Sequence, residues 1–587
     1  MSPGELWTQV NQTLIAKSIG ELCYEQILEP NALSSTSHAQ TFELTLASGA
    51  QYRFEAWRTL WDHLRVRPAS ITRTPDTVEL SAAQFFIDAQ KELGMTDIIL
   101  GNFLDEMHST LYADMHLAEN PPTAREMADW DGRRVQAALN GHPKLLLNKG
   151  RMGWGSGDLE RYAPENEPQF KLVWLALHRD HVTSGLAENV GFDDLALTGL
   201  QPQDLTRFRA HLTERGLAAQ DYLFAPAHPW QWDRILKIQY AGEIAMNRIV
   251  DLGTGGDLYQ PQISLRTLTN VSRAGQLDLK LPLTVLNTSA VRGIPARYIH
   301  QAPSVAEAVS RLCEKDPVLK GAGTTVLSEK GGISYRHPHF AQVTGAPYRY
   351  HETLGAIWRE SAESKLAAGE QSVMSAALMH QDREGSSLIG AYIQKSGLKT
   401  QDWLTRYFET VVVPLYHLQL KYGLGLVAHG QNVVLKMKHH APTGVLLKDF
   451  QGDLRLSSEA PATSLLNDAI KGLDRLPPEY LIHDLLTGHL LTVLRFVSAT
   501  LQESEGFAES DFYRLLSGVI ARYLDAHAPG GVDPRVNLLN EKIHRVLLNK
   551  VRFKIGYADS AERPLPLVGR DLLNPLAKGG IHGTETL

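Results

Sequence analysis

The segment from residue 402 to residue 452 constrains the fold most, because it predicts a helix, a loop and a β-hairpin in direct succession. Apolar residues at helical spacing form one face of the helix: Leu404, Phe408, Val411, Leu415 and Leu418. Pro414 is expected to kink this helix mildly. Gly423 and Gly425 are expected to end it.

Two strands are predicted after the helix, VVLKMK at 433–438 and GVLLKD at 444–449, joined by HHAPTG. The loop before the first strand presents His429, Gly430, Gln431 and Asn432. The hairpin brings Asp449 back beside Asn432. A fold that mixes helices with such a hairpin belongs to the α+β class.

The order of these polar residues points to a nucleotide and a metal. Asn and Asp oxygens suit Mg²⁺, which keeps few protein ligands and shares the phosphate oxygens of its substrate. The pattern resembles the catalytic and metal loops of kinase-like phosphotransferases. We therefore expect Asn432 and Asp449 to hold Mg²⁺ and ATP, with His429 and Gln431 beside them.

One difference from a kinase changes the expected reaction. A kinase loop carries an aspartate base between its histidine and its asparagine, whereas only Gly430 and Gln431 stand there in this chain. The missing base fits an acceptor that is already ionised at neutral pH, such as a carboxylate. The alternative is that His429, Asn432 and Asp449 only cap the hairpin.

Two further segments supply cations and hydroxyl groups. They are SLRTLTN (264–270), with Ser264, Arg266 and Thr267, and KLPLTVLNTSAVRGIP (280–295), with Lys280, Thr288, Ser289 and Arg292. Arginine forks match the geometry of carboxylates and phosphates. Each segment alone fits a surface ion pair, but the two together favour a site for a polyanion.

A third basic segment is HPKLLLNKGRMGWG at 142–155, where Lys149 and Arg151 stand among three glycines. Such a loop can close over phosphates, although it lacks the order of a P-loop. The segment HPWQWD at 228–233 is more typical of a structural corner than of a site.

Composition excludes several classes of protein. The net charge of −7 and the absence of a basic stripe argue against a nucleic-acid binder. No apolar stretch approaches the ~20 residues that span a bilayer, and the start of the chain has no secretory pattern. Two cysteines in 587 residues, Cys23 and Cys313, are typical of buried thiols in a cytoplasmic protein.

Four segments, taken in this order and spacing, resemble the IucA/IucC family. They are GHPKLLLNKGRMGWG, HPWQWD, SLRTLTN with KLPLTVLNTSAVRG, and AHGQNVVL with KDFQG. This family comprises siderophore synthetases that work independently of non-ribosomal peptide synthetases. The resemblance runs from the N-terminal helix to about residue 575. The resemblance is nearest to the subgroup that acts on a citryl monoamide. Three segments support this placement: RYAPE (161–165), PYRYHETLGAIWRE (347–360) and YLIHDLLTGH (480–489).

The resemblance implies a three-lobed α+β fold with a kinase-like palm: a thumb at 1–165, fingers at 166–375 and a palm at 376–587. It implies adenylation of a citrate-like carboxylate by ATP, release of pyrophosphate, and attack by the amine of an N-hydroxylated, N-acylated lysine or diamine. It also implies a homodimer.

Carried over by motif, the nucleotide and metal positions are Ser264, Arg266, Thr267, Lys280, His429, Asn432 and Asp449. Thr288, Arg292 and His429 lie near the carboxylate substrate, with Ser289 beside them. Lys149 and Arg151 fall in the family's N-terminal basic motif. We expect Arg266, Lys280 and Arg292 to be catalytic, together with His429, the candidate base for amine attack.

Three alternatives stay open. A synthetase that forms hydroxamate macrocycles shares much of the motif set. A kinase-like phosphotransferase would yield ADP rather than AMP and pyrophosphate. A protein that only binds a polycarboxylate would not turn ATP over, and it would give no reason for the pairing of Asp449 with Asn432.

Overall fold

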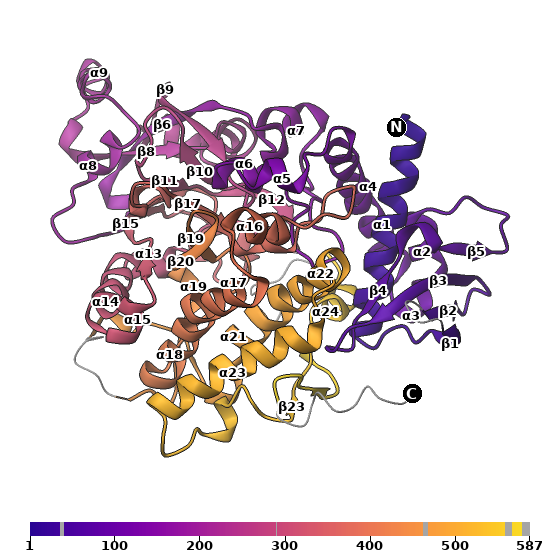
Figure 1. Ribbon diagram of the computed structural model, residues 1–587. Helices are drawn as coiled ribbons and strands as arrows, with labels where there is room; N and C mark the ends of the chain where they lie inside the picture. Colours follow the sequence, from indigo (N-terminus) through magenta and orange to yellow (C-terminus); the bar gives the residue numbers. More distant parts are fainter. Residues whose placement is uncertain (36–39, 289, 462–467, 558–565, 578–587) are drawn as a thin grey trace.

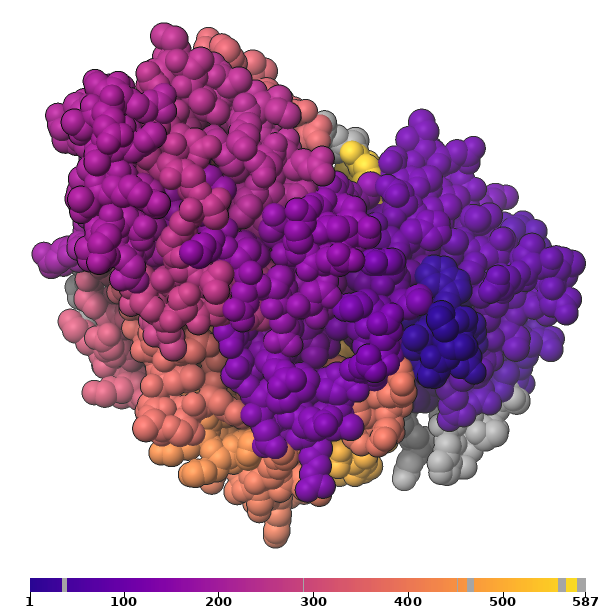
Figure 2. Space-filling view, turned by 90° about the horizontal axis from the view of Figure 1, so that it is seen from above, coloured from indigo at the N-terminus to yellow at the C-terminus, as the bar shows by residue number. Residues whose placement is uncertain are grey.

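The computed structural model describes residues 1–35, 40–288, 290–461, 468–557 and 566–577. Figure 1 shows a mixed arrangement of helices and sheets, as the α+β prediction requires. In Figure 2 the N-terminal part lies beside the middle part of the chain, and orange C-terminal segments are visible beneath them. In the described residues, no helix combines the length and the apolar character needed to cross a membrane.

The N-terminal part packs one long helix against a small antiparallel sheet. Helix α1 (Pro3–Tyr24) begins with a capping box between Ser2 and Glu5. The sheet contains β1 (Asn31–Ser35), β2 (Gln40–Thr45), β3 (Gln51–Arg58), β4 (Leu64–Val66) and β5 (Thr72–Thr74). Helices α2 (Ala82–Asp88) and α4 (Asp97–Glu119) complete its core.

The middle part is built on an eight-stranded sheet. Its order is β7 (Val182–Leu186), β15 (Glu329–Tyr335), β16 (Gly355–Arg359), β11 (Asp278–Lys280), β10 (Thr267–Asn270), β9 (Ile249–Pro261), β6 (Phe170–His178) and β8 (Tyr222–Ala227). Beside it stands a separate hairpin, β12 (Leu283–Asn287) with β13 (Ala290–Arg292). Strands β10 and β11 pair so that Thr267 lies opposite Lys280.

The predicted hairpin is present but its turn is shorter than expected. Strands β19 (Val433–Lys438) and β20 (Ala441–Leu447) are joined by His439 and His440 alone. Both histidines have positive φ values, 50° and 60°, as a tight two-residue hairpin turn requires. Strand β20 is one residue longer than β19, and the register shift between Lys436 and Met437 accommodates the additional residue.

The sheet that contains the hairpin also includes strands that precede residue 375, where the boundary between fingers and palm is expected. Strand β14 (Thr324–Val326) pairs with β20 in parallel, and β17 (Glu370–Met374) pairs with β19. Helix α14 (Ala302–Lys315) packs into the same hydrophobic core through Val305, Val309 and Leu312. Residues from about 302 onward thus contribute to the core that surrounds the hairpin.

The helix before the hairpin is continuous through a wider turn. It consists of α17 (Thr400–Tyr407), the π-helical turn η10 (Phe408–Val412) and α18 (Val413–Tyr422). Pro414 sits in the first turn of α18, where its missing N–H is tolerated beside the π turn. Gly423 ends the helix in the left-handed conformation, with φ of 64°.

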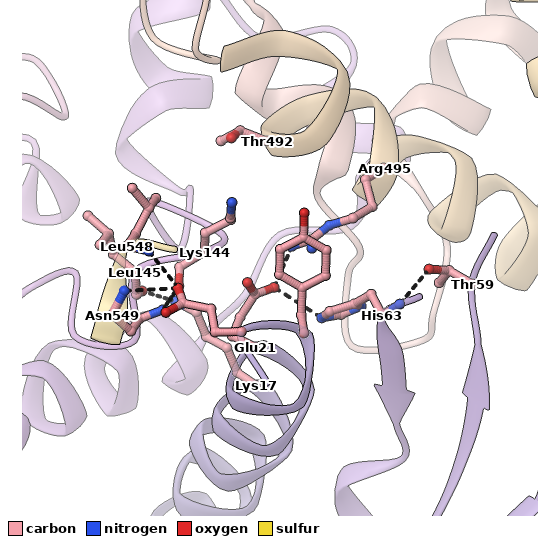
Figure 3. A network of polar contacts seen from close by, with 12 residues as sticks. Lys17, Glu21, Thr59, His63, Lys144, Leu145, Thr492, Arg495, Leu548 and Asn549 are labelled. Atoms are coloured by element: carbon pink, nitrogen blue, oxygen red, sulfur yellow. Dashed lines mark hydrogen bonds and ion pairs between the residues drawn. The ribbon is translucent and has the colours of Figure 1, made fainter. Parts of the chain in front are cut away.

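A buried polar network joins the two ends of the chain (Figure 3). Glu21 of α1 accepts hydrogen bonds from Arg495 at 2.5 Å and His63 at 3.0 Å. Arg495 begins helix α22 (Arg495–Glu505) and is fully buried. Glu25 accepts the backbone N–H groups of Leu548 and Asn549 at 2.9 Å, which caps helix α24 (Asn549–Ile555). These contacts attach the C-terminal segment to the N-terminal helix.

The substitution Arg495→Met tests this network. It leaves the Glu21 carboxylate buried without its guanidinium partner, a change that costs about 3–5 kcal/mol for buried ion pairs. We expect urea unfolding at neutral pH to show a loss of that size. Arg53→Met is the control, because Arg53 pairs with Glu43 at the surface with 60% of its side chain exposed, where such pairs contribute at most ~1 kcal/mol. Equal losses in the two variants would contradict the account.

Candidate active site

A pocket of about 240 Å³ brings most of the predicted site residues together. Its walls come from the loop at 141–148, the β10–β13 region, residues 374–379, the loop before β19, and the segment after β20. The predicted residues among its lining are Ser264, Arg266, Thr267, Lys280, Thr288, Arg292, His429, Gln431, Asn432 and Asp449. Ser289 lies outside the described residues.

Asp449 forms the centre of the pocket's charge cluster. Its Oδ1 accepts hydrogen bonds from Lys280 Nζ at 2.7 Å and from Arg359 Nη1 at 2.9 Å. Burial alone would raise the pKa of Asp449, but the charges of Lys280, Arg359 and Lys448 outweigh it and hold the pKa well below its usual range. Asp449 is therefore an anion, and it sits at a left-handed backbone position with φ of 63°.

Arg359 is a member of this cluster that the sequence did not identify. It ends β16, opposite Asp278 of β11, and only 2% of its side chain is exposed. Because β11 carries Lys280 two residues after Asp278, the sheet register delivers both cations to the same carboxylate. The motif PYRYHETLGAIWRE contained Arg359, but nothing in it indicated a partner 90 residues away.

Asn432 is oriented by two hydrogen bonds from its amide nitrogen. Nδ2 donates to the backbone oxygen of Val427 at 3.1 Å and to Asp453 Oδ2 at 3.0 Å. The amide oxygen is thereby left as the atom available to the pocket. Together with the carboxylate of Asp449, it provides the kind of hard oxygen pair that Mg²⁺ prefers when phosphates supply further ligands.

The described residues contain no group of three or more His, Cys, Asp or Glu side chains arranged to hold a metal by themselves. A magnesium ion at this place would therefore depend on its nucleotide. Asn432 and Asp449 fit that requirement, since they offer two oxygens rather than a full protein cage.

His429 is held as a hydrogen-bond donor. Its Nδ1 accepts the backbone N–H of Gln431 at 3.2 Å, so the neutral ring carries its proton on Nε2. Burial lowers the pKa of His429, although Asp453 and Asp449 oppose the shift. A neutral ring with Nδ1 occupied has no nitrogen left to accept a proton. This geometry favours a donor role for His429, and the base role expected for it stays a prediction.

His142 is a second pocket histidine, and the sequence did not assign it to the site. Its Nδ1 accepts the backbone N–H groups of Lys144 at 3.2 Å and Leu145 at 3.0 Å. Burial lowers the pKa of His142 well below its usual range. Its position at the start of the HPKLLLNKGRMG motif was the signal that could have found it. His142 and His429 thus both offer Nε2–H groups.

The loop that carries His142 is fixed by the network of Figure 3. Lys17 Nζ donates to the backbone oxygens of His142 at 3.0 Å and Leu145 at 2.6 Å. Asn549 Nδ2 donates to the backbone oxygen of Lys144 at 3.0 Å. The first helix and the C-terminal segment therefore set the position of one pocket wall.

The hairpin β12–β13 presents the remaining polar groups. Thr288 occupies a left-handed position, with φ of 49°, at the turn that leads to Arg292. Arg266, just before β10, donates to the backbone oxygen of Gly293. This contact connects the pocket wall predicted to bind the substrate carboxylate with the wall predicted to bind the phosphates of ATP.

Lys149 and Arg151 do not line the pocket. Lys149 Nζ contacts Asp114 and the backbone oxygen of Asn140, both at 2.6 Å. Arg151 forms a two-pronged ion pair with Glu165, and its backbone N–H donates to the pocket residue Asn287. Arg151 thus supports the β12–β13 hairpin, whereas Lys149 holds α4 (Asp97–Glu119) to the loop at Asn140. Contact of either cation with phosphates stays a prediction.

A larger cavity of about 1060 Å³ lies between α1, β3, β4 and α22. Its charged lining is already paired: Arg65 contacts Glu503 at 2.6 Å, Arg58 contacts Asp62 at 2.5 Å, and Glu21 holds Arg495. The smaller pocket is the better candidate, because it gathers the cations and oxygens that nucleotide chemistry needs.

Two family models match the chain. The IucA / IucC family covers residues 134–380, and a family described as ferric iron reductase FhuF-like transporter covers residues 401–560.

Individual relatives extend over nearly the whole chain. Aerobactin synthase of Vibrio mimicus is 39% identical over 586 residues, which cover 98% of each protein. The structure of aerobactin synthetase IucC from Klebsiella pneumoniae has a TM-score of 0.85 and 37% identity, covering 98% of this chain and 99% of that one. The structure of ATP-bound aerobactin synthetase IucA from the same organism shares the fold, with a TM-score of 0.74. It is 18% identical, and the match covers 98% of this chain and 99% of that one.

The resemblance expected from the motifs is thus confirmed by full-length similarity. The chain belongs to the IucA/IucC family of siderophore synthetases.

Proposed function

We propose that the protein is an ATP-dependent carboxylate–amine ligase that adenylates a citrate-derived carboxylate and condenses it with the amine of a hydroxamate building block. One observation carries the proposal: the same pocket holds three cations, Arg266, Lys280 and Arg292, and the oxygens of Asn432 and Asp449. Cations suit a substrate carboxylate and phosphates, and the oxygens suit a metal–nucleotide complex.

In the first half-reaction, a carboxylate oxygen of the substrate attacks the α-phosphorus of ATP and pyrophosphate leaves. Negative charge builds up on the phosphoryl oxygens and on the departing group. Lys280 and Arg266 are fixed beside this region and stabilise that charge without having to reorganise. Asn432 and Asp449 would hold Mg²⁺, which supplies additional positive charge to the phosphates when bound.

Substrate orientation falls to the opposite wall. The guanidinium of Arg292 and the hydroxyl of Thr288 can bind a neighbouring carboxylate or hydroxyl of the citryl group. The Nε2–H groups of His142 and His429 can donate to its oxygens as well. Such contacts place the reacting carboxylate near the nucleotide, so they contribute proximity rather than bond making.

The proposed substrates follow the similarity to aerobactin synthases. We propose a citryl monoamide as the carboxylate and an N-acylated, N-hydroxylated lysine or diamine as the acceptor. The second candidate is a hydroxamate synthetase that forms macrocycles, because the pocket motifs are shared with that subgroup. Product mass spectrometry with citryl monoamide, ATP and a panel of hydroxamate amines separates the two.

Other features of the protein are also proposals. The three parts correspond to a thumb (1–165), fingers (166–375) and a kinase-like palm (376–587), in which β19 and β20 carry the nucleotide loops. Lys149 and Arg151 would reach the phosphates only if their ion pairs opened. Use of ATP supports a cytoplasmic location, and the family resemblance supports a homodimer, which size-exclusion chromatography with light scattering would test.

The reaction products distinguish a ligase from a kinase-like phosphotransferase. With ATP, Mg²⁺, citryl monoamide and a hydroxamate amine, we expect AMP and pyrophosphate to form in step with the amide, because the pocket lacks a kinase base between His429 and Asn432. Nucleotide chromatography measures this outcome. Formation of ADP would instead establish phosphoryl transfer.

Removal of the Arg292 guanidinium should strongly slow carboxylate-dependent pyrophosphate release. For Arg292→Ala we expect a loss of about a hundredfold to a thousandfold, the range for deleting one fixed donor in a catalytic site. Arg297→Ala is the matched control, because Arg297 is exposed on α13 (Ala296–Ile299), five residues further along the chain. Unchanged release in Arg292→Ala would remove this residue from the substrate site.

A further inference from the structure

We propose that Asn148 recognises the amide N–H of a citryl monoamide and so selects this substrate over citrate. The inference rests on the proposed ligase function and identifies a residue that determines which carboxylate the pocket accepts. Asn148 stands on the pocket wall that the loop at 141–148 provides, together with Gly141, His142 and Pro143.

Citrate and its monoamide differ in the hydrogen bonds that one end of the molecule can make. At neutral pH the third carboxylate of citrate accepts hydrogen bonds at both oxygens and donates none. In the monoamide, the same end has one accepting oxygen and one donating N–H group. A pocket that distinguishes the two therefore needs an acceptor for the N–H beside a donor for the oxygen.

Most polar side chains around the proposed citryl site are donors. Arg292 is a cation, and His142 and His429 offer Nε2–H groups because backbone N–H groups occupy their Nδ1 atoms. These groups suit the carboxylates of the substrate. Thr288 Oγ1 donates to the backbone oxygen of Asn287 at 2.7 Å, so its lone pairs can accept the hydrogen bond of the citryl hydroxyl. The amide N–H is the substrate donor for which these residues offer no acceptor.

Asn148 supplies an acceptor that has no donor. Its Nδ2 donates to the backbone oxygen of His142 at 3.4 Å. The opposite orientation of the amide would set two oxygens against each other, so Oδ1 lies on the other side of the group. Oδ1 is buried and receives no hydrogen bond from any residue that the structure describes. A buried acceptor without a donor is unfavourable, and an N–H group of the ligand would satisfy it.

The position of Asn148 is fixed by the backbone around it. Gly141 has a φ of 94°, and a Cβ atom at this residue would lie 3.1 Å from Asn148 Cγ. The missing side chain of Gly141 thus lets the Asn148 amide lie against the loop. The His142 backbone oxygen that Asn148 contacts is also held by Lys17 Nζ at 3.0 Å. These contacts hold the amide of Asn148 in place before a ligand binds.

His142 and Asn148 together complement a secondary amide. The Nε2–H of His142 can donate to the amide oxygen, while Asn148 Oδ1 accepts the amide N–H. Citrate at the same place would set a carboxylate oxygen against Asn148 Oδ1, and the two acceptors would repel each other. Asn148 thus orients and selects the substrate and takes no part in bond making.

Three substrates test the assignment with the wild-type protein: a citryl monoamide, citrate, and the citryl monoester in which an oxygen atom replaces the amide N–H. The measured rate is carboxylate-dependent exchange of labelled pyrophosphate into ATP, which gives kcat/KM for each substrate. We expect the amide to exceed the ester and citrate by about tenfold to a hundredfold, because the amide alone gives Oδ1 a donor. Equal values for amide and ester would overturn the proposal.

The variant Asn148→Leu removes the acceptor at nearly constant side-chain volume. We expect kcat/KM for the amide to fall about tenfold to a hundredfold, and the values for the ester and citrate not to fall, so that the preference for the amide disappears. Asn102→Leu, at an exposed position on α4, is the matched control and should keep the wild-type preference. An equal fall for all three substrates would assign Asn148 a purely structural role and contradict selection.

The variant Asn148→Asp keeps an acceptor oxygen and covers the case in which Asn148→Leu does not fold. We expect it to retain the preference for the amide and to use citrate even less, because two carboxylates repel each other. Loss of the amide preference in Asn148→Asp would overturn the proposal. Absence of exchange with all three substrates in the wild-type protein would refute the ligase function itself, which distinguishes that failure from a wrong assignment of Asn148.

Discussion

The ion cluster of Asp449 with Lys280 and Arg359 is the interaction on which the rest of the site depends. It joins the end of the hairpin β19–β20 to the neighbouring strands β11 and β16, and so connects the two walls of the pocket. Burying three charged groups is costly unless they neutralise one another. Lys280 and Arg359 do so by donating to the same carboxylate oxygen of Asp449, at 2.7 and 2.9 Å. Under the proposed function, the phosphates would become the partners of Lys280, and Mg²⁺ the partner of Asp449.

The ends of the chain support this site from a distance. Lys17 of α1 and Asn549 of α24 both hold backbone oxygens of residues 142–145, and Glu21 is bound to Arg495 of α22. The pocket wall that presents His142 is therefore built from parts of the sequence more than 400 residues apart. A fold of this kind places its reacting groups through long-range contacts, which gives each catalytic side chain support that a single loop could not provide.

Local patterns in the sequence were sufficient to predict the secondary-structure elements, but they did not predict the interaction partners of the site residues. The hairpin, the end of its preceding helix at Gly423 and the grouping of Arg266, Lys280 and Arg292 follow from periodicity, glycine placement and residue type. Arg359 and His142 could not be assigned in the same way, because their roles depend on sheet register and on backbone N–H groups of a loop. Lys149 and Arg151 illustrate the converse. Their charges suggested phosphate binding, yet Asp114 and Glu165, which pair with them, carry no local signal of doing so.

The central claim is that a substrate carboxylate attacks the α-phosphorus of ATP in this pocket. A carboxylate labelled with ¹⁸O tests it most directly, because the attacking oxygen stays on phosphorus when the acyl group moves to the amine. Mass spectrometry of the nucleotide after a single turnover should find one ¹⁸O atom in AMP and none in pyrophosphate. Label in inorganic phosphate with ADP as the nucleotide product, or unlabelled AMP, would contradict the adenylation mechanism.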